Sequence, residues 1–357
     1  MTRIVIATDA WHPQINGVVT TLEKVGTELR MLGNEVLFLT PEPFRTVPLP
    51  SYPSIRLALV TGRTVGRIVD QFEPDAIHIA TEGPIGHAVR AHCLRNGLKF
   101  TTSYHTQFPE YIRLRTPIPK HWTYTYLRYF HGAATRTLVA TISLQRQLVR
   151  QGFRNVAIWS RGVDTNLFYP RPKSVLQVSR PISMYVGRVA VEKNIEAFLS
   201  IDLPGSQFVV GDGPDLDALR KRYPRTHFLG CKRGEELAYV LAAADVFVFP
   251  SRTDTFGLVM LEAMACGVPV AAYPVTGPID VIQQGKTGVM SENLSEAVFK
   301  ALALDGRACV DYARAHSWRR CAEKFISHLD LPSECTTINM EYGGLSKHFC
   351  NILEKSS

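Results

Sequence analysis

The chain has 357 residues, of which 45% are hydrophobic and 20% are charged. These fractions are typical of globular domains and exclude a disordered or fibrous chain. Because domains usually contain about 100 to 200 residues, this length predicts two domains and a cleft between them. The chain opens on a strand-like run instead of a signal peptide, and no stretch approaches about 18 uninterrupted apolar residues, so we expect a cytoplasmic protein.

The charge is distributed unevenly along the chain. The formal net charge is +8, and the whole excess lies in residues 1–170. Between Tyr111 and Val163 there are nine basic residues and no acidic ones. Such a run predicts a surface for an anionic partner, and nucleic acid is disfavoured because no known binding module accompanies it. The nine residues are Arg113, Arg115, Lys120, Arg128, Arg136, Arg146, Arg150, Arg154 and Arg161.

The seven cysteines are scattered and odd in number, with no CxxC pair. This pattern argues against a disulfide framework and against a zinc site.

Apolar runs and amphipathic runs alternate in the first half of the chain. This alternation is typical of a parallel sheet covered by helices. The predicted strands are 3–9, 35–41, 75–80, 99–105 and 137–141, and the predicted helices are Val18–Leu32, one starting near Ile85, and Leu144–Gln151.

The same alternation restarts after a proline-rich stretch at about residues 168–180, which we interpret as a domain link. The sequence therefore predicts two Rossmann-like α/β domains, residues 1–170 and 171–330, and leaves residues 331–357 unassigned. In the second domain the predicted strands are 182–187, 207–212, 226–230, 245–250 and 268–272, and the helices are Asn194–Leu199, Leu216–Tyr223, Glu235–Ala243 and Leu258–Ala265.

Ligands of open parallel sheets bind beyond the carboxyl ends of the strands, so the loops after strands are the candidate sites. Gly17 lies in such a loop and could let a helix N-terminus face an anion, or could be an ordinary turn glycine. His105 follows a strand, where a purely structural, hydrogen-bonded histidine is the commoner case. Gly187 ends another strand, and Arg188 and Lys193 beside it suit a diphosphate, or are solvated surface charges.

The segment SRTDTFGLVMLEAMACG carries two acidic residues, Asp254 in a turn and Glu262 in an otherwise apolar helix. A carboxylate in such a helix must be solvated, paired or bound to a ligand, because burying an unsatisfied charge is costly. Asp215 and Asp217 form a DxD pattern, which holds a metal in some sugar transferases. Here they fall in the predicted first turn of a helix, where carboxylates stabilise the helix, so we interpret them as structural and expect no metal.

Together, VGRVAVEKN, GDGP and AADVFVFPSRTDTFGLVMLEAMACGVPV resemble the family 4 glycosyltransferases over residues 3–330. The resemblance implies the GT-B fold, two Rossmann-like domains facing an active-site cleft, and retaining transfer of a sugar from a nucleotide diphosphate sugar without a cofactor. YHTQFPEY and IWSRGVD are most similar to sulfoquinovosyl and glucuronosyl diacylglycerol synthases and to GDP-mannose-dependent mannosyltransferases.

The resemblance also implies a role for each candidate residue. Glu262 would bind the nucleotide ribose, and Asp254, an Asp where the family carries Glu, would bind a sugar hydroxyl. Arg188 and Lys193 would hold the diphosphate after Gly187. His105 would approach the transferred sugar. The remaining donor-binding positions are Gly17, Phe256, Gly257 and Leu258.

We therefore expect a UDP-sugar-dependent enzyme that glycosylates a lipid such as diacylglycerol at the inner face of the cytoplasmic membrane. The alternatives are a GDP-mannose-dependent mannosyltransferase and a non-catalytic nucleotide-sugar-binding protein. Arginines and aromatic residues mix in YIRLRTPIPKHWTYTYLRYFHGAATR, which favours docking on an anionic membrane, although an aromatic core helix with a solvated basic face fits the composition too. The residues predicted for membrane and acceptor are Arg113, Arg115, Lys120, Trp122 and Arg128.

Overall fold

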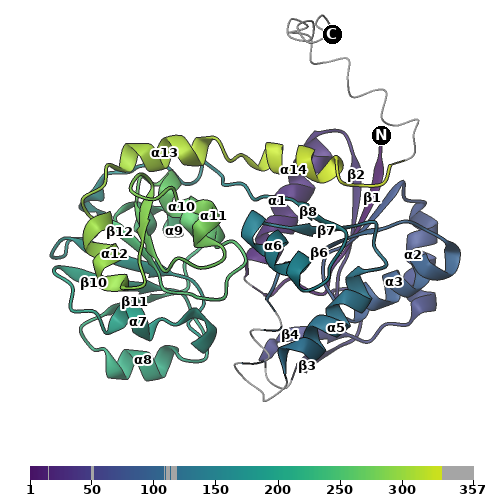
Figure 1. Ribbon diagram of the computed structural model, residues 1–357, viewed down its shortest axis with the longest axis horizontal. Coiled ribbons are helices and arrows are strands. Elements are labelled where there is room, and N and C mark those ends of the chain that lie inside the picture. The colour runs from purple at the N-terminus through teal and green to yellow at the C-terminus, as the bar shows by residue number, and fades with distance from the viewer. Residues whose placement is uncertain (15, 50–51, 108, 110–112, 114–118, 332–357) are drawn as a thin grey trace, which may run out of the picture.

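The computed structural model describes residues 1–14, 16–49, 52–107, 109, 113 and 119–331. In the first half of the chain, six strands form one parallel sheet in the order β2-β1-β5-β6-β7-β8 (Figure 1). A short antiparallel hairpin of β3 and β4 lies outside this sheet. The strands are β1 (Arg3–Ala7), β2 (Glu35–Leu39), β3 (Thr46–Leu49), β4 (Tyr52–Ala58), β5 (Ala76–Ile79), β6 (Thr101–Ser103), β7 (Arg136–Val139) and β8 (Val156–Ile158).

A second six-stranded parallel sheet follows, in the order β11-β10-β9-β12-β13-β14. The predicted pair of parallel α/β domains is thus confirmed. The strands of this sheet are β9 (Ile182–Val186), β10 (Ser206–Val210), β11 (His227–Gly230), β12 (Val246–Phe249), β13 (Val270–Ala272) and β14 (Gly288–Met290).

Three helices of the first half begin directly after a side chain that caps them. Asn16, Thr61 and Thr141 each accept a hydrogen bond from a backbone N–H in the first turn of the helix that follows. Such bonds satisfy amide groups that have no partner inside the helix. The helices described in the first half are α1 (Gly17–Met31), α2 (Gly62–Phe72), α3 (Pro84–Asn96), α5 (Lys120–His131) and α6 (Ile142–Arg150), of which α1, α2 and α6 are capped in this way.

In the second half, α10 (Leu258–Ala265) has the predicted bounds, and the other predicted helices differ by one or two residues at their ends. The remaining helices are η1 (Lys173–Val175), η2 (Val191–Lys193), α7 (Glu196–Leu199), α8 (Leu216–Arg222), α9 (Gly234–Ala242), α11 (Pro278–Val281), α12 (Leu294–Ala301), α13 (Gly306–Arg314) and α14 (Trp318–Ile326).

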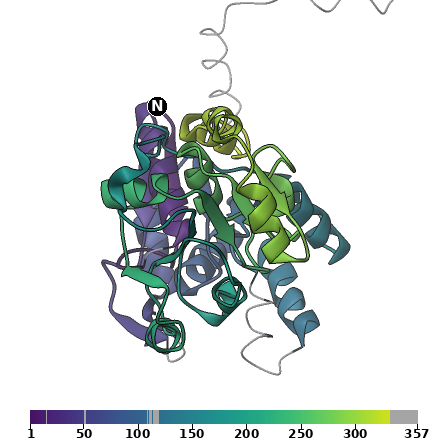
Figure 2. The same ribbon diagram turned by 90° about the vertical axis from the view of Figure 1, so that its left-hand side faces the viewer.

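The last helix returns to the first domain. Trp318 and Phe325 of α14 pack in one buried cluster with Ile4 and Ile6 of β1. Helices α13 and α14 run along the top of the molecule, α13 above the second domain and α14 above the first (Figure 1), and the yellow-green helices lie at the top in the turned view as well (Figure 2). The sequence placed this segment in the second domain, 171–330, but its contacts belong to the first, because its apolar face completes the core around α1.

Candidate functional site

Two loops that follow strands of different sheets touch where the domains face each other. His105 follows β6, and the turn 250–257 follows β12. Thr255 donates its hydroxyl hydrogen to the backbone oxygen of His105 at 2.8 Å. Gln107 Nε2 donates to the backbone oxygen of Asp254 at 3.3 Å. The structure thus brings His105 and Asp254, predicted from separate domains, into one site.

Lys193 and Asp254 form an ion pair in this site. Lys193 Nζ lies 2.5 Å from Asp254 Oδ1, and the two side chains are only 20% and 15% exposed. The second carboxylate oxygen, Asp254 Oδ2, is buried and has no hydrogen-bond partner. Arg188, half-buried, stands in the same loop as Lys193. A buried carboxylate oxygen without a donor is costly, which indicates that a ligand group completes it.

Two glycines hold backbone conformations that bring these loops together. Gly257, directly before α10, has a φ of +81°, and a Cβ there would lie 2.8 Å from Cζ of Phe249. Gly187, directly after β9, has a φ of +151°, and a Cβ there would lie 2.7 Å from the Tyr185 hydroxyl oxygen. Side chains at either position would therefore push the Arg188 loop or the start of α10 out of place.

The N-termini of α1 and α10 meet across the domain boundary. A Cβ on Gly17 would lie 3.4 Å from Cδ1 of Leu258. Asn16 Oδ1 already accepts from the amides of Val18 and Val19, at 3.0 and 3.1 Å. Two of the amides predicted to face an anion therefore already have a partner in Asn16. Gly17 matters chiefly because its lack of a side chain lets α1 approach Leu258 closely. Phe256, next to Gly257, is buried.

The imidazole of His105 rests on a buried arginine. Arg161 Nη2 lies 3.1 Å from His105 Nδ1, and its guanidinium group stacks 4.4 Å from the ring centre of Trp159. His105 Nε2 is buried and has no partner. Burial lowers the pKa of His105 well below its usual value, and the charge of Arg161 lowers it further. Arg161 was expected on an anion-binding surface; that expectation is wrong for this residue, which is only 5% exposed.

Glu262 lines a cavity of about 250 Å³ between the domains. Burial raises the pKa of Glu262 to about 7, an effect that Lys24 of α1 partly opposes. Among the described residues, nothing forms a hydrogen bond or ion pair with its carboxylate. The second domain also contributes Lys232 and Arg233, which follow β11. A half-buried carboxylate and several cations therefore face one space that a nucleotide could enter.

Asp215 and Asp217 lie at the start of α8, as predicted. Asp215 occupies the position before the first residue of the helix, and Asp217 lies in its first turn. The last turn contains three basic residues. The acidic start and the basic end therefore both interact favourably with the helix dipole. In the part of the chain that the structure describes, no three His, Cys, Asp or Glu side chains are grouped to hold a metal ion.

Helix α5 carries the aromatic residues predicted to face a membrane. One side of it is core, with Tyr124, Leu127 and Phe130 buried. The opposite side exposes Trp122, Tyr126 and Tyr129, with exposed fractions of 68%, 43% and 66%. The cations Arg113 and Lys120 are exposed as well and Arg128 is half-buried, while Arg115 lies outside the described residues. The helix is therefore part of the core on one side, as the second interpretation expected, and docking of its other side on a membrane stays a prediction.

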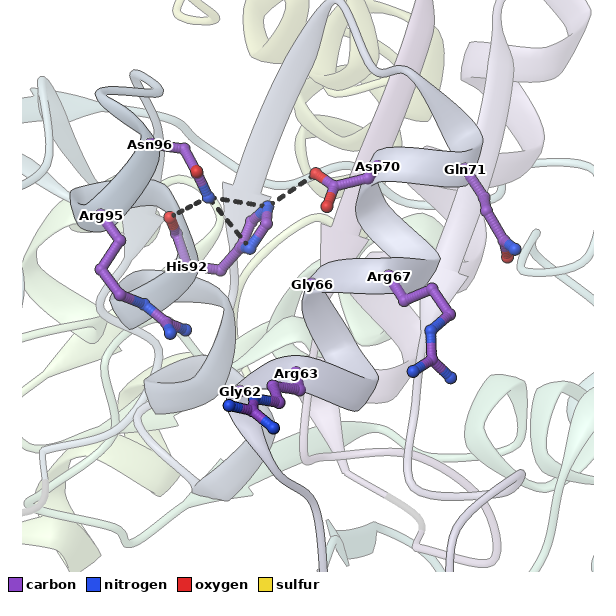
Figure 3. A pocket seen from close by; sticks show the side chains of 9 residues that line it. All are labelled: Gly62, Arg63, Gly66, Arg67, Asp70, Gln71, His92, Arg95 and Asn96. Carbon is purple, nitrogen blue, oxygen red and sulfur yellow. Dashed lines mark hydrogen bonds and ion pairs between the residues drawn. The ribbon is translucent and has the colours of Figure 1, made fainter.

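A second cavity, of about 610 Å³, lies away from this site between α2 and α3 (Figure 3). Arg63 and Arg67 of α2 and Arg95 of α3 line it, and no carboxylate of the described chain pairs with them. Nε2 of His92 donates to the carboxylate of Asp70 at 2.9 Å, and both residues line this groove. The groove holds none of the predicted donor residues and adds positive charge to the first domain.

Two family models match the chain and together cover both domains. The one described as Glycosyltransferase Family 4 matches residues 15–167, and the one described as Glycosyl transferases group 1 matches residues 180–304. Sulfoquinovosyl transferase SQD2 of Arabidopsis thaliana is 32% identical over 83% of this chain and 67% of its own length. A GDP-mannose-dependent alpha-mannosyltransferase of Mycobacterium tuberculosis is 30% identical over 81% of this chain and 83% of its own.

The chain belongs to glycosyltransferase family 4. Its fold is that of solved GT-B structures, which confirms the predicted fold class. A sucrose-phosphate synthase from Thermosynechococcus elongatus superposes with a TM-score of 0.73 at 20% identity, covering 92% of this chain and 98% of that one. HepE of Anabaena, solved with UDP-glucose, has a TM-score of 0.68 at 16% identity, over 92% and 99% of the two chains.

Sequence reasoning missed four side chains of this glycosyltransferase that line the cavity or support the site. Lys232 and Arg233 follow a strand, so the rule that drew attention to the other loops would have found them. Arg161 stands in IWSRGVD, which supported the resemblance, but the sequence assigned it only to the predicted anion-binding surface. Lys24 lies about two turns into α1, and nothing in the local sequence places it opposite Glu262.

Proposed function

We propose that this glycosyltransferase moves a hexose or hexuronate from a nucleotide diphosphate sugar, with a UDP-sugar favoured, to a lipid acceptor such as diacylglycerol, with retention of configuration. The donor site is supported chiefly by two buried atoms that have no hydrogen-bond partner, His105 Nε2 and Asp254 Oδ2. They belong to two loops that are hydrogen-bonded to each other. A sugar has hydroxyl groups that can satisfy both atoms at once.

The other residues fit the rest of the donor. Glu262 faces the cavity between the domains, where its carboxylate would accept hydrogen bonds from the two ribose hydroxyls. Arg188, Lys193 and the N-terminus of α10 at Gly257 would hold the diphosphate. Lys193 is paired with Asp254 in the free protein, so the donor would share this cation with the carboxylate.

In the proposed reaction the acceptor hydroxyl attacks the anomeric carbon from the face that the diphosphate leaves. The bond between this carbon and the diphosphate oxygen breaks, a bond to the acceptor oxygen forms, and the acceptor proton passes to the leaving diphosphate. Negative charge grows on the diphosphate as its bond breaks. Fixed cations lower that barrier, by about 3 kcal/mol for each well-placed donor.

The decisive experiment is a panel of donors with one lipid acceptor. UDP-glucose, UDP-galactose, UDP-glucuronate and GDP-mannose are each incubated with diacylglycerol and the purified enzyme, and glycolipid is measured. We expect a product with one UDP-sugar. Product from GDP-mannose alone would instead support the second candidate, which the mannosyltransferase relatives at about 30% identity favour. Family membership favours an enzyme over the non-catalytic binding protein.

Transfer is expected to proceed without a metal. Arg188, Lys193 and the helix N-terminus at Gly257 supply the positive charge that a divalent cation gives to other sugar transferases. Adding EDTA to the assay should leave the rate unchanged within about twofold. Complete inhibition that magnesium or manganese reverses would contradict this expectation and would return attention to Asp215 and Asp217.

The lipid acceptor would reach the site from an anionic membrane docked on α5. Trp122, Tyr126 and Tyr129 follow one another at helical spacing of four and three residues, so they form one exposed stripe. Aromatic side chains beside cations are typical of an interface with lipid head groups. No helix within the described residues has the length and apolar character to span a bilayer, and attraction of about 1 kcal/mol per cation near the surface would give reversible binding.

Vesicle flotation at low salt tests this docking. We expect recovery with anionic vesicles to exceed recovery with neutral ones, and to fall when Trp122 and Tyr129 are both changed to Ser, or when Arg113, Arg115 and Lys120 are. The matched control is Phe299→Ser on α12, an exposed aromatic residue of the second domain. Equal recovery with both kinds of vesicle, or no loss in the variants, would refute membrane docking.

A further inference from the structure

A buried arginine with no acidic partner lies directly behind the proposed sugar site. Arg161 Nη1 donates to the backbone oxygen of Trp159 at 2.6 Å and to that of Ser160 at 3.3 Å. Among the described residues, no carboxylate forms an ion pair with its guanidinium group. Its remaining polar contact is His105 Nδ1, at 3.1 Å. The protein therefore buries a charge next to the active site without neutralising it, although removing such a charge from water is costly.

The contact with His105 has a fixed direction. A guanidinium group carries five N–H donors and no acceptor. His105 Nδ1 must therefore accept this hydrogen bond with its lone pair, which places the single proton of the neutral ring on Nε2. Nε2 is the buried atom without a partner, in the loop that Thr255 joins to the Asp254 turn. The ring thus carries a buried N–H group without a partner, in a loop that is hydrogen-bonded to the turn of Asp254.

We propose that Arg161 is a positioning residue for the donor sugar: it holds His105 in one orientation and one tautomer, so that Nε2–H donates a hydrogen bond to the sugar. This inference rests on the proposed donor site. His105 is then a donor and not a base, which agrees with a reaction in which the leaving diphosphate takes the acceptor proton. Asp254 Oδ2 accepts a hydrogen bond from a sugar hydroxyl. Of the two protein atoms, His105 Nε2 thus donates to the sugar and Asp254 Oδ2 accepts from it.

The side chain of Trp159 holds Arg161 in place. Stacking on the fully buried Trp159 fixes the plane of the guanidinium group. Trp159 in turn donates from Nε1 to the backbone oxygen of Cys321 at 3.0 Å, which ties it to α14. Lysine at position 161 could still donate to Nδ1, but it has no planar group to stack on the indole. Arg161→Lys is therefore a conservative variant and Arg161→Met a disruptive one.

The first test reads the tautomer in the unaltered enzyme. Protein labelled with ¹⁵N-histidine is examined by NMR near neutral pH, and the His105 signals are assigned by their absence in His105→Gln. We expect Nε2 to carry the proton and Nδ1 to be bare. In Arg161→Met we expect a mixture of tautomers, and in Arg161→Lys the original pattern. A proton on Nδ1 in the unaltered enzyme would overturn the proposal, whatever the enzyme transfers.

The second test is a double-mutant cycle on donor kinetics. Arg161→Met should lower kcat/KM for the donor about tenfold in the native background and by less than about twofold in His105→Ala, because its effect passes through His105. Arg171→Met is the matched control, since Arg171 is a buried arginine that stacks on Tyr239 outside the site. Equal losses from Arg161→Met in both backgrounds would show a merely structural role and refute the proposal.

The two proposals fail in distinguishable ways. If His105→Ala leaves donor kinetics unchanged, the placement of the sugar at His105 is wrong, and with it the proposed donor site. If His105→Ala lowers kcat/KM but the NMR spectrum shows Nδ1 protonated, the donor site stands and the role of Arg161 falls.

Discussion

Arg188→Ala and Lys193→Ala are each expected to lower turnover about tenfold or more while the protein remains folded. Both residues follow β9, Arg188 in the loop and Lys193 at the end of η2, where the proposed diphosphate leaves. A charge-assisted hydrogen bond contributes about 1.5 to 3 kcal/mol, and each 1.4 kcal/mol in the barrier changes the rate about tenfold. Because the charge develops as the bond breaks, kcat should fall more than the donor KM rises.

The two variants differ in what they leave behind. Lys193→Ala also strips Asp254 of its cation and leaves a largely buried carboxylate unpaired, so this variant should melt at a lower temperature than Arg188→Ala. Adding Asp254→Asn to Lys193→Ala should restore the melting temperature but not the turnover. Lys173→Ala is the matched control, because Lys173 pairs with Asp245 at 3.0 Å in the same domain, outside the site. Unchanged turnover in Arg188→Ala or Lys193→Ala would remove that residue from the reaction.

Local sequence was enough to predict the helices and strands whose ends are marked by glycine or proline. Helix α10 was predicted residue for residue because Gly257 and Gly267 mark its ends and nearly every position between them is apolar. Hairpin β3–β4 and helix α2 were not predicted, since that segment shows no clear alternation. The place of α14 could not be predicted either, because its core partners in β1 lie more than 300 residues away in the sequence.

In the candidate site, too, the sequence predicted which residues matter but not which contacts they make. Position after a strand was enough to single out His105, Arg188 and Lys193. That Lys193 pairs with Asp254 depends on how two loops of one sheet edge are spaced, and no periodicity encodes it. The burial of Arg161 was misjudged for a related reason: a run of like charges gives the charge of a segment, whereas the burial of one member depends on the backbone around Trp159.

Glu262→Gln is expected to weaken binding of the bare nucleoside diphosphate about tenfold and yet to stabilise the fold above pH 7. In the folded protein burial raises the pKa of Glu262 to about 7, from a value near 4.5. The folded state therefore holds this proton more tightly than the unfolded chain does. The resulting stability is present in full below pH 4.5 and is lost as the pH rises toward 7. Glutamine carries no charge, so the variant avoids that loss.

The same ionisation should control nucleotide binding. Two ribose hydroxyls donate best to an ionised carboxylate, so the affinity of the unaltered enzyme for UDP or GDP should fall as the pH drops from about 8 to about 6, whereas Glu262→Gln should bind equally at both. Calorimetric titration and thermal melting at these two pH values measure both effects. Asp254→Asn is the matched comparison, because it changes a carboxylate beside the sugar and should keep the bare nucleotide while altering the preference among donor sugars. If Asp254→Asn lost the nucleotide and Glu262→Gln retained it, the ribose and sugar assignments of the two carboxylates would be reversed.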